Sequence, residues 1–368
     1  MGRNMQTIYL LLPKIFGLIC LIGISVGVRS EIIFEESFDT QPDFTSSMEL
    51  NLEGWSHHNN SSVEWSPSSG FPEKHDAFEV LASNIDKARG GRGKSYVAWR
   101  ESYDPGWSRY NTDGILMKVL PEKHEALYVS FYVKLSEQWT SAGSSKFFRV
   151  YSWDESSGTP FKFFNDGSAG PMLGWNYAHS AYGVRNFLSF RGGPHGKNYK
   201  ITADDILGSP REPGGLGDIS LNFAGNTVGM AEDGGTPKVR DQVGGGYISD
   251  DLNQTVTTEQ IFGDAKAWVK MAFYVQMNSA PGVADGHVRQ WINDELIFSN
   301  DNVRWVGQTV DNKMVGWNAV AIGGNDFFQF YSNDKRYEEW YAIDDIVVRT
   351  DIPVGKKAPN PPSNISIN

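Results

Sequence analysis

The sequence predicts a single all-β domain. Apolar and polar residues alternate with a period of two in many short segments, which is the pattern of strands that bury one face. The 39 glycines and 17 prolines lie between these segments, where they suit turns better than long helices. Hydrophobic residues make up 40% and charged residues 21% of the chain, so there is ample material for a core and general disorder is excluded. Because large all-β domains often exceed about 200 residues, 368 residues are compatible with one domain.

The first 30 residues have the composition of a secretion signal. Arg3 and Lys14 precede an apolar run at 15–28, and Val28-Arg29-Ser30 has small or short residues at the positions that a signal peptidase prefers. An uncleaved anchor is the alternative, but the run is shorter than the roughly 20 residues that span a bilayer. We therefore expect a secreted or extracellular protein, or a periplasmic one, with no membrane contact after signal removal. Cys20 is the only cysteine, so the mature chain would be stabilised by its core, and by a metal if one binds, rather than by disulfides.

The domain itself is expected at 31–352. It opens with an alternating strand at 31–39 (EIIFEESFD). Further strands are expected at 95–100, 127–135, 147–153, 269–277, 288–298, 319–322 and 341–349. The best short helical pattern is at 258–264.

Two segments lack the strand pattern. Residues 155–250 are rich in Gly, Pro, Asn, Asp and Ser, and they predict long loops between short strands. Long loops in a compact domain are usually functional, although a tolerated surface insertion is the alternative. Residues 353–368 carry prolines at 359, 361 and 362 and predict an extended tail or linker, or else the start of a following module.

The charge balance limits the partners. The formal net charge is −11 and no long run of Lys and Arg occurs, so nucleic acid is not an expected partner. An anionic polymer would need a locally basic cleft within the acidic whole. The segment at 90–95 (GGRGKS) ends like a phosphate-binding loop, but Ala88 stands where that motif needs glycine. No organic cofactor is therefore expected.

One segment carries a family resemblance. The alternating strand at 268–277 (WVKMAFYVQM) is followed by the loop NSAPGVADG and by HVRQWINDELIF, where Asn293 and Asp294 suit a hairpin turn. Together with the later YAIDDIVV, this pattern resembles the concanavalin A-like lectin/glucanase superfamily, particularly its polysaccharide-lyase-like members. The resemblance implies a β-sandwich, or jelly roll, of two antiparallel sheets with long loops. It also implies a concave sheet that forms a groove for polysaccharide.

The resemblance further implies a structural calcium ion. In related folds, an aspartate of the last strand binds calcium together with backbone carbonyls of the first strand, and that position matches Asp344. Glu36 or Asp39 would supply further oxygen ligands, the kind that calcium prefers. The alternative is a carboxylate pair at the end of a strand with no metal.

The acidic residues argue against one class of enzyme. Retaining glucanases of this superfamily carry a Glu-x-Asp-x-x-Glu strand, which places two carboxylates on one face. The sequence has no such motif, so a glycosidase of that kind is not expected. A lyase instead needs a cation or amide to neutralise the uronate carboxylate, and a Tyr or His to transfer protons.

Three strands offer such residues at alternating positions. The candidates for catalysis are Arg149, Tyr274, Gln276 and His287. The candidates for substrate binding are Tyr151, His195, Arg289 and Trp291, with His195 in a loop that also contains Arg191 and Lys197. We expect these faces to line one groove. The alternative is that they are ordinary solvent faces of a sandwich, with the tryptophan in the core.

The sequence therefore supports one leading hypothesis and two alternatives. The first is a secreted polysaccharide lyase that cleaves a uronate-containing polysaccharide by β-elimination. The second is a non-catalytic carbohydrate-binding or adhesion module. The third is a structural surface protein without a glycan partner.

Overall fold

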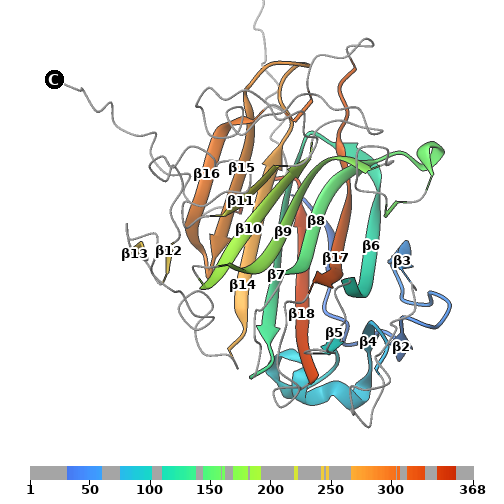
Figure 1. The fold of residues 1–368 in the computed structure, drawn as a ribbon. Helices are drawn as coiled ribbons and strands as arrows, with labels where there is room; N and C mark the ends of the chain where they lie inside the picture. Colours follow the sequence, from blue (N-terminus) through green and yellow to red (C-terminus); the bar gives the residue numbers. More distant parts are fainter. Residues whose placement is uncertain are drawn as a thin grey trace, which may run out of the picture.

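The described residues fold into two antiparallel sheets with almost no helix (Figure 1). The computed structural model describes residues 31–59, 75–101, 110–137, 144–158, 160–161, 169–180, 183–191, 219–222, 242–243, 246–247, 267–303, 305–306, 313–327 and 338–353. The helical elements in these ranges are three short 3₁₀ turns, η1 (Ala82–Lys87), η2 (Arg89–Gly91) and η3 (Glu155–Ser157). The expected all-β sandwich is confirmed.

The larger sheet has nine strands. Their order is β16 (Glu295–Val303), β15 (Gly286–Ile292), β14 (Val269–Gln276), β7 (Ala126–Leu135), β18 (Glu338–Arg349), β5 (Tyr96–Glu101), β4 (Phe78–Val80) and β2 (Phe44–Thr45). β1 (Ile32–Glu36) pairs with β18 beside this path. The last strand of the described chain thus lies in the middle of the sheet, between β7 and β5.

The smaller sheet has seven strands. Their order is β11 (Ile219–Asn222), β10 (Gly183–Arg191), β9 (Ala169–Ser180), β8 (Ser144–Trp153), β17 (Trp317–Phe327), β6 (Tyr110–His124) and β3 (His57–Asn59). A separate ribbon pairs β12 (Gln242–Val243) with β13 (Gly246–Tyr247).

Aromatic side chains from both sheets form the centre of the core. On β14, Phe273 alternates with outward residues and is 1% exposed. Its ring stacks at 4.8 Å on Phe148 of β8, which in turn lies 5.2 Å from Phe131 of β7. Because aromatic burial removes a large apolar area from water, this contact between the sheets contributes strongly to holding them together.

The expected strands are present, and the expected hairpin is confirmed. Asn293 and Asp294 both have positive φ, 49° and 67°, as a two-residue turn of type I′ requires. The Asn293 side chain accepts from the Lys270 N–H at 2.9 Å, and its own N–H donates to the Lys270 carbonyl at 2.8 Å. These bonds fix the turn against β14.

Two expectations need correction. Residues 155–250 contain the long strands β9 and β10 rather than only short ones, because these strands pair with each other over nine residues and β9 also pairs with β8. β6 was not expected at all. The predicted helix at 258–264, residues 1–30 and nearly all of the tail at 353–368 lie outside the described residues. Among the residues that the structure describes, no helix is long and apolar enough to cross a membrane.

Candidate functional site

The polar residues of the hairpin face outward from the nine-stranded sheet. On β14 the side chains of Phe273 and Val275 enter the core, so Tyr274 and Gln276 point the other way. The antiparallel register places Tyr274 opposite Arg289 and Gln276 opposite His287. Directly opposed residues on one face lie about 5 Å apart at Cβ. The hairpin therefore brings the four polar side chains together.

Hydrogen bonds join these residues to a carboxylate on the next strand. Asp301 of β16 bonds to His287 Nδ1 at 2.6 Å and accepts from Arg289 Nη2 at 2.8 Å. The Tyr274 hydroxyl donates to Gln276 Oε1 at 2.8 Å, and the Arg289 guanidinium carbon lies 5.7 Å from the Tyr274 ring centre. We call these five residues the β14–β15 cluster.

The side chains of the cluster differ in their exposure to solvent. The side chain of Asp301 is 53% exposed, that of His287 is 29% exposed and that of Arg289 is 10% exposed. A ligand that approaches the face therefore meets Asp301 and His287 before Arg289. Partial burial also strengthens the Arg289–Asp301 pair relative to a fully exposed one.

Burial sets the protonation of Tyr274. Desolvation is the largest cause that raises the pKa of Tyr274, the Arg289 charge opposes it, and the charges of Glu125 and Asp301 add to the rise. The phenol is thus protonated at neutral pH and acts as a hydrogen-bond and proton donor. His287 is held by a carboxylate through one ring nitrogen. When that nitrogen carries the proton, the other is free to accept one.

Trp291 does not offer a surface for a sugar. It lies on the same outward face, but it is 1% exposed and packs edge-on against Tyr128 at 5.9 Å. Leu296 and Ile352 pack against this small apolar cluster. Its assignment as a substrate-binding residue is therefore not supported, because the chain covers the ring.

Arg149 and Tyr151 lie on the other sheet. They face outward from β8, which pairs with β9 and β17 and not with β14. Arg149 is 5% exposed and donates from Nη1 to the Gly323 carbonyl at 2.9 Å, and Tyr151 is fully buried. The expectation that one groove contains Arg149, Tyr274 and His287 is wrong, because the outward faces of the two sheets point away from each other. His195 lies outside the described residues.

The three expected calcium ligands separate into two groups. Glu36 accepts hydrogen bonds from the Phe38 N–H, Gln41 Nε2 and Trp55 Nε1, at 2.5, 2.6 and 3.0 Å. These bonds tie the first strand to the loop that follows it. Glu36 therefore already serves as the acceptor of a structural network.

Asp344 and Asp39 remain as a pair of interacting carboxylates. Asp344 is 3% exposed and accepts from the N–H groups of Arg89 and Asp345, at 3.0 and 2.8 Å. Burial raises the pKa of Asp344 to about 7, and the charges of Asp345 and Asp39 add to the rise. Within the described ranges, no group of three or more His, Cys, Asp or Glu is arranged to hold a metal ion. The two carboxylates have the donor chemistry for calcium, but backbone carbonyls or waters would have to complete the shell.

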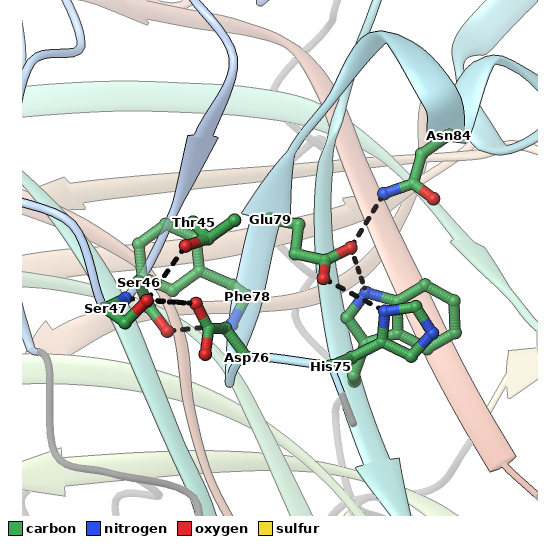
Figure 2. Close-up of polar contacts among 9 residues, drawn as sticks. Thr45, Ser46, Ser47, His75, Asp76, Phe78, Glu79 and Asn84 are labelled. Carbon is green, nitrogen blue, oxygen red and sulfur yellow. Dashed lines mark hydrogen bonds and ion pairs between the residues drawn. The ribbon is translucent and has the colours of Figure 1, made fainter. Parts of the chain in front are cut away.

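A second polar cluster lies near the other end of the same face and was not expected from the sequence. Glu79 of β4 is 5% exposed and accepts from His75 Nδ1, Asn84 Nδ2 and Trp99 Nε1, at 2.9, 3.0 and 2.9 Å. Figure 2 shows His75 and Asn84 converging on its carboxylate. The His75 ring stacks on Trp99 with centroids 3.6 Å apart. The only signal in the sequence is a glutamate inside the apolar run AFEVL.

Comparisons with known proteins give similarity of fold at low sequence identity. No family model and no curated protein matches the chain. Among solved structures, the chain is similar to an endo-β-1,4-glucuronan lyase from the fungus Trichoderma reesei, with a TM-score of 0.45, 10% identity and coverage of 86% of this chain and 95% of that one. It is also similar to alginate lyase Aly36B, with a TM-score of 0.44, 10% identity and coverage of 86% of this chain and 95% of that one. An alginate lyase from Aplysia kurodai gives a TM-score of 0.44, 8% identity and coverage of 86% and 98%. Because the TM-scores are below 0.5 and the identities are about 10% or less, the proposed function is based on this chain's own residues.

Proposed function

We propose that the protein is a polysaccharide lyase that cleaves a uronate-containing polymer by β-elimination at the β14–β15 cluster. The observation that supports this proposal is the register of the hairpin, which sets a phenol and an amide opposite a guanidinium and an imidazole. These are the groups that this chemistry requires. They are partly buried, so their charges act more strongly than in water.

Each residue has a role that follows from its surroundings. Arg289 and the Gln276 amide would bind the uronate carboxylate and withdraw its charge, which makes the C5 proton more acidic. His287, oriented by Asp301, would remove that proton. The C5–H electrons would form the C4–C5 double bond while the C4–O bond breaks. Tyr274, which burial keeps protonated, would donate its proton to the leaving oxygen.

The test is whether the purified protein releases unsaturated products from glucuronan and alginate. Their release is measured by ultraviolet absorbance. Wild type should release product, and Tyr274→Phe should be slower by about 100-fold or more, because it loses the proton donor but keeps the ring. Tyr132→Phe is the matched control, since Tyr132 lies on β7 of the same sheet, outside the cluster. The proposal fails if folded wild type releases no product from any uronate polymer, or if both variants behave alike.

One observation favours the alternative of a carbohydrate-binding module without catalysis. Asp301 already forms an ion pair with Arg289, so a substrate carboxylate must compete with it for that guanidinium. A glycan array distinguishes the two functions. Binding of uronate glycans without product release would support the module.

We also propose that the protein is exported and that Asp344 and Asp39 hold a structural calcium ion. The basis for export is the signal-like composition of residues 1–30. Its test is the N-terminal sequence of the protein recovered from the culture medium or periplasm, which should begin near residue 31. The basis for calcium is the buried Asp344 carboxylate that interacts with Asp39.

A further inference from the structure

Three tryptophans and two lysines alternate across the outward face of the nine-stranded sheet. The order is Trp99 of β5, Lys87 of η1, Trp340 of β18, Lys134 of β7 and Trp268, which immediately precedes β14. Lys87 Nζ lies 5.2 Å from the Trp99 ring centre and 5.5 Å from that of Trp340. Lys134 Nζ lies 5.6 Å from the Trp340 ring centre and 6.0 Å from that of Trp268. We call these five residues the Trp–Lys ladder.

The sheet register builds this arrangement from distant parts of the sequence. Trp340 is opposite Trp99, and Ala342 lies between Val97 and Lys134. Val97, Trp99 and Ala342 form a buried floor, against which Trp268 and Trp340 pack while remaining partly exposed. The strands β7, β18 and β5, which carry Lys134, Trp340 and Trp99, are neighbours in the sheet, and β14, which follows Trp268, pairs with β7 (Figure 1).

The ladder holds its lysines in place before any ligand arrives. Each ammonium lies near two indole rings, and such contacts contribute about 0.5–1 kcal/mol each at exposed sites. The side chain of Lys87 is only 14% exposed, so most of its length is packed. A cation that is already ordered loses less conformational entropy when it binds an anion than a freely rotating lysine does.

Two described acidic groups, Asp86 and Glu79, lie close to the Lys87 end of the ladder. Asp86 pairs with Lys87 at 3.1 Å, and because its side chain is 68% exposed, a sugar carboxylate can displace it into solvent. The carboxylate of Glu79 is already bonded to His75, Asn84 and Trp99. In a chain with a formal net charge of −11, two ordered lysines among indoles form a local site for anions with apolar faces.

We propose that the Trp–Lys ladder binds a segment of an anionic polysaccharide, with sugar carboxylates at Lys87 and Lys134 and the apolar faces of the sugars against exposed parts of Trp268 and Trp340. The choice of a uronate polymer rests on the proposed function. Trp268 precedes Tyr274 of β14 by six residues, which is about 20 Å along a strand. A long polymer can therefore contact both the ladder and the β14–β15 cluster, whereas a very short oligosaccharide contacts only one.

The experiment compares Lys87→Ala/Lys134→Ala with a charge-matched control. Alginate and glucuronan are the anionic probes, hydroxyethyl cellulose is the neutral probe, and binding is measured by affinity electrophoresis and calorimetry. The double variant should bind the anionic polymers about three- to tenfold more weakly per lysine lost, and wild-type binding should weaken with salt. The control Lys123→Ala/Lys313→Ala removes the same charge and should bind like wild type, since both lysines are exposed and lie outside the ladder.

Kinetics give a second readout. The double variant should raise KM for polymer and leave the turnover of short oligosaccharides unchanged. If it does not fold, Lys87→Gln and Lys134→Gln are tested singly, because they keep much of the packing. The proposal is overturned if folded ladder variants bind anionic polymer like wild type, if wild type binds none, or if the neutral polymer binds equally well.

The outcomes separate this proposal from the lyase proposal. Binding is also measured in a Tyr274→Phe background, where turnover is expected to be slower by about 100-fold or more. Ladder-dependent binding without any unsaturated product would uphold the ladder and contradict the lyase function. Product release with no effect of the ladder variants on binding or KM would uphold the lyase function and contradict the ladder.

Discussion

The buried carboxylate of Glu79 ties together β4, β5 and η1, so its loss is expected to destabilise the fold. Glu79→Ala would leave the donors of Asn84 and Trp99 without their acceptor, and these residues are 6% and 4% exposed. An unsatisfied buried donor costs about 1–3 kcal/mol. His75 is more accessible and can bind water instead. The free energy of unfolding should therefore fall by about 2–5 kcal/mol.

The same residue predicts a dependence of stability on pH. Burial raises the pKa of Glu79, but the hydrogen bonds from His75, Asn84 and Trp99 together outweigh it and hold the pKa below its ordinary value of 4.5. The folded state thus binds this proton less readily than the unfolded state. The stabilisation is complete above the unfolded pKa and is lost as the pH falls through the lowered folded pKa. Glu79→Gln should lose less stability than wild type on acidification through this window.

Urea unfolding, followed by tryptophan fluorescence at neutral pH and at several acidic pH values, measures both effects. Glu49→Ala is the control, since Glu49 is exposed, and surface changes of this kind usually shift stability by less than about 0.5 kcal/mol. If Glu79→Ala unfolds at the same urea concentration as Glu49→Ala, the network does not stabilise the fold. Parallel acid profiles of wild type and Glu79→Gln would likewise refute the assigned pKa shift.

Four further predictions follow from other parts of the molecule. Asp301→Asn should slow product release by about 100-fold without unfolding the protein, because His287 loses the carboxylate that orients it; an unchanged rate would remove His287 as the base. Gly323→Ala should cost about 2 kcal/mol or more in urea unfolding, since φ is +81° and a Cβ would lie 2.1 Å from a backbone oxygen; an unchanged midpoint would contradict this packing. Phe273→Ala should cost about 3–5 kcal/mol, with Phe273→Leu milder; equal midpoints would show that the ring does not join the sheets. Removal of calcium with a chelator should lower Tm by several degrees, and Asp344→Asn should abolish that shift; if calcium has no effect on wild type, the metal proposal is wrong.

The strands were predictable wherever one face is buried and the other is not. The burial of β14 alternates along its length, as the sequence at 269–277 predicts. β6 was missed because Gly114 and Pro121 normally interrupt strands. In the structure, Pro121 lies where the register with β17 shifts between Ala319 and Trp317, so regular pairing there does not need its missing N–H.

The candidate site was predictable only within the hairpin. The short turn at Asn293 and Asp294 fixes which residues of β14 and β15 face each other, so the grouping of Tyr274 with His287 follows from local sequence. Asp301 was missed because the pairing of β15 with β16 contains two register shifts. Arg149 was misplaced because alternation indicates which face a residue occupies but not which sheet its strand joins.

The position of β18 in the sheet also has a consequence for biosynthesis. β7 and β5 are both made long before β18, which must later pair with both of them and with β1. At about 5–20 residues per second, a ribosome needs tens of seconds to reach residue 349. Until β18 has been made, the edges of β5 and β7 that pair with it remain unpaired. Such long-range pairing also folds slowly. A nascent chain of this topology is therefore expected to depend on chaperones that cover those edges until its last strand emerges.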